Sequence, residues 1–167
     1  MSEIFNGKFY NPTKGNLSFE RVVKEIVFYI SEKPEKFYDI VVCCDSSSGE
    51  EPNFPLAIVV LRRGHGGRFF LKRVHYQNRK FYNLKQRILE EVFLSCQLAL
   101  TLKEKLNEKL RGKNYHYQLR YIHADIGENG ATKDMIKEVI GLIKGNGFEP
   151  KIKPESFAAT VVADRYS

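Results

Sequence analysis

The stretch that decides the fold is IVVCCDSSSGE, residues 40–50, an apolar run that ends at a single carboxylate, Asp45. A run this apolar is typical of a strand in the middle of a sheet, with both faces covered. A carboxylate at its end is costly unless a metal ion, a cationic partner or solvent meets it. We therefore ask which other acidic residues converge on Asp45.

The elements around this strand favour an α/β fold. Apolar periodicity predicts an amphipathic helix over residues 16–33, and a Gly-rich turn joins two apolar segments, 55–63 and 68–76, into a hairpin. A helix, a strand, a helix, a short strand and a last helix follow over residues 84–110, 117–124, 132–144, 148–153 and 156–166. This order predicts a mixed sheet with helices on its faces.

Length and composition indicate an ordinary globular protein. The chain has 167 residues, of which 43% are hydrophobic and 28% charged. We expect one domain over residues 1–167, in which residues 1–15 form an N-terminal arm with little regular structure. No apolar run approaches the roughly 20 residues of a membrane span, and the N-terminus lacks the apolar core of a signal peptide. These features predict a cytoplasmic protein that does not enter a membrane.

The three cysteines predict no metal site and no disulfide. Cys43, Cys44 and Cys96 fit no metal-ligand spacing, and adjacent cysteines do not readily pair with each other. We expect buried free thiols in a reducing compartment.

The positive charge is concentrated in one part of the chain. The formal net charge is +7, yet residues 52–89 contain nine Lys or Arg and no Asp or Glu. Basic groups bind phosphates, and the aromatic residues among them could stack on bases or turn into the core. We therefore expect nucleic acid, RNA or an RNA–DNA hybrid in particular, as the partner. The predicted contacts are Arg62, Arg63, Arg68, Lys72, Arg73, Arg79 and Lys80.

Spacing in the long helix distinguishes two neighbouring glutamates. Steps of four and three place Glu91 on one stripe with Leu84, Ile88, Ser95, Leu98 and Leu102. Glu91 therefore interrupts an apolar face. Glu90 lies on a polar face with Gln86, Gln97 and Thr101 and is predicted to be a solvated surface charge.

Four acidic residues from four elements form a candidate metal and catalytic site: Asp45, Glu91, Asp125 and Asp164. Asp125 ends a predicted strand, and Asp164 shares a face of the last helix with Phe157 and Val161. Clustered carboxylates need a metal ion or a raised pKa, and oxygen ligands suit Mg²⁺ or Mn²⁺. Each residue also has a structural alternative: a turn carboxylate for Asp45, and loop amides for Asp125. The alternatives for Glu91 and Asp164 are pairs with Arg87 and Arg165.

Five segments of the chain resemble the YkuK-type family of uncharacterised bacterial proteins. These segments are LSFERV, the Asp45-Ser46 pair, LKQRILEEVFLS, HADIGENGATKDMIKEVIG and IKPESFAATVVADR, and the resemblance spans residues 17–165. It implies a ribonuclease H-like, mixed five-stranded sheet with helices on both faces and an extra N-terminal helix. The family pattern has Gly-Thr where this chain has Cys43-Cys44, and a glutamine where it has Ser47, so the polar contacts around Asp45 differ.

The resemblance and the four carboxylates together imply a metal-dependent nuclease. Two ions about 4 Å apart can activate a water and stabilise the leaving oxygen of a phosphodiester. The alternative is a non-catalytic nucleic-acid-binding module of the same fold. A phosphotransferase or ATPase of the related actin-like architecture is disfavoured, because the chain is too short for two such domains and lacks a second phosphate loop.

Overall fold

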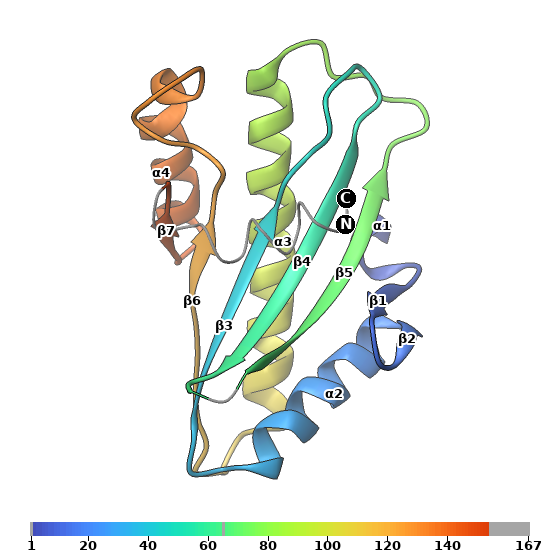
Figure 1. Cartoon of the computed structure of the whole chain (residues 1–167), viewed down its shortest axis with the longest axis vertical. Coiled ribbons are helices and arrows are strands. Elements are labelled where there is room, and N and C mark those ends of the chain that lie inside the picture. The colour runs from blue at the N-terminus through green and yellow to red at the C-terminus, as the bar shows by residue number, and fades with distance from the viewer. Residues whose placement is uncertain (1, 65, 154–167) are drawn as a thin grey trace.

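A computed structural model describes residues 2–64 and 66–153 of the protein (Figure 1). Within these residues one mixed sheet has seven strands in the order β2-β1-β5-β4-β3-β6-β7. Its main strands are β3 (Phe37–Cys44), β4 (Asn53–Arg62), β5 (Gly67–His75), β6 (His116–His123) and β7 (Glu149–Lys151). β3 pairs antiparallel with β4 and parallel with β6, and β6 pairs parallel with β7. The expected mixed sheet is therefore confirmed.

The N-terminal segment has more regular structure than predicted. It forms a short helix α1 (Ser2–Phe5) and a hairpin of β1 (Phe9–Asn11) and β2 (Gly15–Leu17). Asn11 accepts hydrogen bonds from the backbone N–H groups of Thr13 and Lys14, and its side-chain amide donates to the Phe69 carbonyl of β5. This turn attaches the hairpin to the edge of the sheet, so the sheet has seven strands rather than five.

The helices begin and end close to the predicted residues. α2 (Phe19–Glu32) starts at Ser18, whose hydroxyl accepts a hydrogen bond from the Arg21 N–H at 3.2 Å. α3 (Leu84–Lys109) starts at Asn83 in the same manner. A 3₁₀ turn, η1 (Lys133–Met135), leads into α4 (Ile136–Gly145). The capping side chains satisfy N–H groups that a helix start leaves unpaired.

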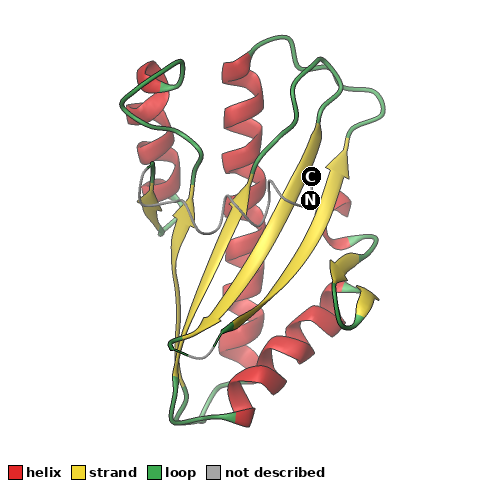
Figure 2. Cartoon of the chain, viewed as in Figure 1, coloured by secondary structure: helices red, strands yellow, loops and turns green. Residues whose placement is uncertain are grey.

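The described helices pack against one face of the sheet. Figure 2 shows α3 running behind the strands, and buried side chains of α2, α3 and α4 form one cluster with Ile40, Val42 and Cys44 of β3. The opposite face carries a smaller apolar cluster: Val41, Cys43, Ala57, Val59 and Leu71, with Phe69 packed against it. Helices on both faces were expected; the described helices cover one face, and the helix predicted over residues 156–166 lies outside the described residues.

Burial explains the apolar character of β3. Its last five residues are buried, because α3 covers one face and the smaller cluster occupies the other. Cys43, Cys44 and Cys96 are buried free thiols, as predicted. No helix in the described parts of the chain is both long and apolar enough to cross a membrane.

Candidate functional site

Two carboxylates follow neighbouring parallel strands. Asp45 comes directly after β3, and Asp125 comes two residues after β6; the two strands run parallel with Cys43 opposite His123. The ends of parallel strands are where α/β sheets place their ligands. Glu91 joins these two residues from α3, which packs against β3. The negative charges of Asp45 and Asp125 both raise the pKa of Glu91, so both aspartates lie within electrostatic reach of Glu91. Asp164 lies outside the described residues.

Glu91 is a buried carboxyl group with no cation beside it in the part of the chain that the structure describes. Its side chain is 4% exposed, and its Oε2 accepts hydrogen bonds from the Ser46 N–H, at 2.8 Å, and from the Ser46 hydroxyl. Burial raises the pKa of Glu91 to about 8; the Ser46 hydrogen bonds oppose this rise, and Asp45 and Asp125 add to it. Among the described residues no Lys or Arg forms an ion pair with Glu91, so the alternative pair with Arg87 does not form. Such a group binds a proton or a metal ion readily.

Asp125 is paired with a lysine that the sequence did not suggest. The Lys153 ammonium lies 2.8 Å from Asp125 Oδ1, and this hydrogen bond raises the pKa of Lys153. The Gly127 N–H donates to Thr132 rather than to Asp125. The strand order could have indicated this pair. β7 runs parallel to β6 with Lys151 opposite His123, so Lys153 and Asp125 each follow by two residues.

The oxygen atoms of these carboxylates are of the type that binds divalent ions. Carboxylate oxygens are the ligands that Mg²⁺ and Mn²⁺ take in proteins, and the Ser46 hydrogen bonds to Glu91 both involve Oε2, not Oε1. Within residues 2–64 and 66–153 no group of three His, Cys, Asp or Glu is arranged as a metal-binding cluster. The described carboxylates Asp45, Glu91 and Asp125 do not by themselves form such a cluster.

Glu90 is buried, which makes the prediction of a solvated surface charge wrong. Its side chain accepts a hydrogen bond from the Tyr76 hydroxyl and lies 3.1 Å from the Arg79 guanidinium. Burial and the hydrogen bond to Glu90 raise the pKa of Tyr76, so Tyr76 remains the donor. The cause lies in the chain after β5, which brings Tyr76 and Arg79 against the start of α3. The spacing of residues in a helix does not show that a distant segment will bury one of them.

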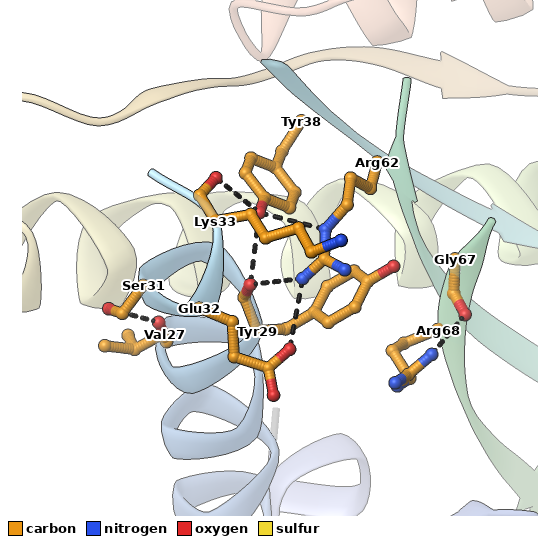
Figure 3. Close-up of polar contacts among 9 residues, drawn as sticks. All are labelled: Val27, Tyr29, Ser31, Glu32, Lys33, Tyr38, Arg62, Gly67 and Arg68. Carbon is orange, nitrogen blue, oxygen red and sulfur yellow. Dashed lines mark hydrogen bonds and ion pairs between the residues drawn. The ribbon is translucent and has the colours of Figure 1, made fainter. Parts of the chain in front are cut away.

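Arg62 and Lys72 are buried, and their donor groups bind to acceptors within the protein. Arg62 is 7% exposed and donates to the Tyr38 hydroxyl at 3.0 Å, to the Tyr29 carbonyl at 2.9 Å and to Glu32 at 3.1 Å (Figure 3). Lys72 is buried and donates to the Asn6 carbonyl. This burial disagrees with the prediction that both residues contact phosphates, because their donors point at protein acceptors.

The other five predicted basic contacts have exposed side chains. Arg63 pairs with Asp39 at 2.8 Å, Arg79 with Glu90, and Lys80 with Glu50 at 3.9 Å. Arg68 and Arg73 are exposed on β5, and the Arg68 guanidinium lies 4.5 Å from the centre of the Tyr29 ring. Exposed ion pairs are weak, so a phosphate could compete for Arg63 and Lys80, whereas Arg79 pairs with the buried Glu90.

Comparison with known proteins identifies the family. A family model described as Ribonuclease H-like matches residues 21–167. This chain belongs to the ribonuclease H-like family. It is also 28% identical to the "Uncharacterized protein YkuK" of Bacillus subtilis (strain 168). This match extends over 169 residues and covers 95% of this chain and 96% of that protein. No solved structure matches the chain. The YkuK-type resemblance and the ribonuclease H-like fold are therefore confirmed, and β1 and β2 are additions at the edge of the sheet.

Proposed function

We propose that this chain is a divalent-metal-dependent nuclease that hydrolyses phosphodiester bonds in RNA or another nucleic acid. Glu91 carries the proposal, because it is buried, has no cationic partner among the described residues, and lies beside Asp45 and Asp125. Burial and the charges of Asp45 and Asp125 make the ionised form of Glu91 costly until a proton or a cation joins it. Membership of the ribonuclease H-like family supports the same activity.

The proposed site residues are Asp45, Glu91, Asp125 and Asp164, which would hold Mg²⁺ or Mn²⁺. When bound, a pair of such ions supplies an activated water for attack on phosphorus and stabilises the leaving oxygen. Ser46 orients Glu91 through two hydrogen bonds to Oε2. With a pKa of about 8, Glu91 holds a proton at neutral pH, and ion binding would release that proton.

Exposed basic side chains would hold the nucleic acid. Arg63, Arg68, Arg73, Arg79 and Lys80 are exposed and come from β4, β5 and the loop that follows β5. Such groups bind phosphates without regard to sequence. We leave Arg62 and Lys72 out of this surface because they are buried.

A non-catalytic nucleic-acid-binding module is the second candidate, and one contact favours it. Lys153 already neutralises Asp125 at 2.8 Å. A lysine ammonium in this position could take the place of a metal ion in a protein that has the fold but no nuclease activity.

Cleavage assays separate the two candidates. Labelled RNA, RNA–DNA hybrid and DNA are incubated with the full chain in Mg²⁺ or Mn²⁺, with and without a chelator. We expect cleavage that the chelator abolishes and that Asp45→Asn lowers by about 100-fold or more. Asp134→Asn removes an exposed carboxylate in η1 and is the matched control, with activity unchanged. Binding without cleavage of any substrate would favour the binding module.

A further inference from the structure

Lys153 is held beside the carboxylates by its backbone as well as its side chain. Its N–H donates to the Ile126 carbonyl at 2.8 Å, in the loop that carries Asp125. Its ammonium then lies 2.8 Å from Asp125 Oδ1. The two contacts fix both ends of the residue on the same loop.

Gly127 makes room for the Lys153 side chain. A Cβ added at Gly127 would lie 3.1 Å from the Cβ of Lys153 and within 3.9 Å of its Cγ and Cδ. The stem of Lys153 therefore lies directly against the backbone of this loop. A bulkier residue at position 127 would displace the stem.

The ammonium of Lys153 faces the carboxylates and also reaches solvent. The hydrogen bond with Asp125 is the main cause that raises the pKa of Lys153, and the charge of Asp45 adds to it. The Lys153 side chain is nevertheless 58% exposed, whereas that of Asp125 is 26% exposed. Lys153 is thus a partly solvated cation beside the carboxylates.

We propose that Lys153 is a phosphate-binding residue of the carboxylate site. It neutralises Asp125 while the carboxylates hold no divalent ion, and it contacts a phosphate of the bound strand once they do. A divalent ion held by Asp125 would repel the ammonium, and the exposed end of the lysine side chain would then turn to the nearest other anion. In the complex with a nucleic acid that anion is a phosphate, which lysine binds as a point charge. This inference rests on the proposed nuclease function.

The test compares Lys153→Gln with Lys24→Gln. Lys24 is equally exposed, at 58%, and also pairs with a carboxylate, Glu20 at 4.0 Å, but it lies on α2, which supplies none of the four carboxylates. Calorimetry measures Mn²⁺ affinity of the full chain without nucleic acid. Steady-state cleavage of a short RNA then gives kcat, KM and the dependence of KM on salt.

We expect Lys153→Gln to change metal and substrate binding in opposite directions. Mn²⁺ should bind about two- to fivefold more tightly, because an exposed competing cation is gone. KM should rise, and the slope of log KM against log salt concentration should fall by about 1, as for one lost phosphate contact. Lys153→Arg should restore the salt slope, and Lys24→Gln should match the wild type.

Three other outcomes would contradict the role of Lys153, the nuclease proposal or both. If Lys153→Gln weakens both Mn²⁺ and RNA binding, Lys153 has a structural role, and thermal unfolding of both Lys153 variants would show the lost stability. If Lys153→Gln changes neither while the wild type binds Mn²⁺ and cuts RNA, the lysine inference fails and the nuclease proposal stands. If the wild type binds no Mn²⁺ and cuts nothing, both fail.

Discussion

Two adjacent glutamates of α3 are buried to nearly the same extent but have opposite surroundings. Glu90 is 7% exposed and meets the Arg79 guanidinium and the Tyr76 hydroxyl. Glu91 is 4% exposed and meets the N–H and hydroxyl of Ser46, with Asp45 and Asp125 close enough to raise its pKa. Arg79 neutralises Glu90, whereas no cationic side chain within residues 2–64 and 66–153 pairs with Glu91.

The difference shows that burial by itself does not mark a functional carboxylate. Consecutive residues of a helix point about 100° apart, so Glu90 faces the chain that follows β5, whereas Glu91 faces the end of β3. Arg79 offsets the cost of burying Glu90. Glu91 has no such compensation among the described residues, so a metal ion or a proton must supply it. We therefore assign Glu90 to stability and propose Glu91 for function.

The largest expected effect is on cleavage. Glu91→Gln should lower kcat by about 100-fold or more, because it removes a proposed metal ligand at nearly constant shape. Glu90→Gln should keep the activity within a few fold, since Glu90 lies with Arg79 and Tyr76. Cleavage of labelled RNA in Mg²⁺ or Mn²⁺ measures both variants. Equal losses would break the distinction between the two glutamates, provided that thermal unfolding shows both variants to be folded.

A smaller effect is expected on the pH dependence of stability. The pKa of Glu91 is about 8 in the folded chain against an ordinary value of 4.5. Between these values the folded chain holds a proton that the unfolded chain has released, so the free energy of unfolding falls as pH rises. The expected slope contributed by Glu91 is at most about 1.4 kcal/mol per pH unit.

Denaturant unfolding across pH 4.5–8 without divalent ions measures this slope. Glu91→Gln should remove the contribution, because the amide does not titrate, and Glu90→Gln should keep it. A slope unchanged by Glu91→Gln would show that the pKa of Glu91 is not raised in the folded chain.

The smallest effect is expected from Ser46→Ala. The Ser46 hydroxyl donates to the ionised form of Glu91 and holds its pKa down. Its removal should move the pKa of Glu91 upward, measured as a shift of the pH-dependent unfolding window to higher pH. Ser47→Ala is the control, because the Ser47 hydroxyl bonds to the Asn53 N–H and not to Glu91. A downward shift in Ser46→Ala would mean that the hydroxyl does not stabilise the carboxylate.

Local sequence patterns predicted what local physics controls. The bounds of α3 were right to within one residue, because its apolar period and its end at a Gly-containing turn are properties of neighbouring residues. The apolar run before Asp45 and the stripe through Glu91 were likewise correct, because both segments are buried. Parallel pairing of β3 with β6 was enough to bring Asp125 near Asp45.

Contacts between distant segments could not be predicted in the same way. The burial of Arg62 depends on Tyr29 and Glu32 of α2 and on Tyr38 of β3, which are 24 to 33 residues away. The β1–β2 hairpin depends on Asn11 reaching Phe69, 58 residues along the chain. A count of basic residues treats Arg62 and Arg68 alike, and only the packing separates them.

By itself, the sequence determined the elements from α2 to β7 and their order, because periodicity and turn signals are encoded in neighbouring residues. The tertiary structure alone decided which charges are compensated. Glu90 and Glu91 differ by one position in the sequence, yet Arg79 meets one and Asp45 and Asp125 surround the other. Electrostatic free energy depends on distance and solvent exposure, and folding sets both.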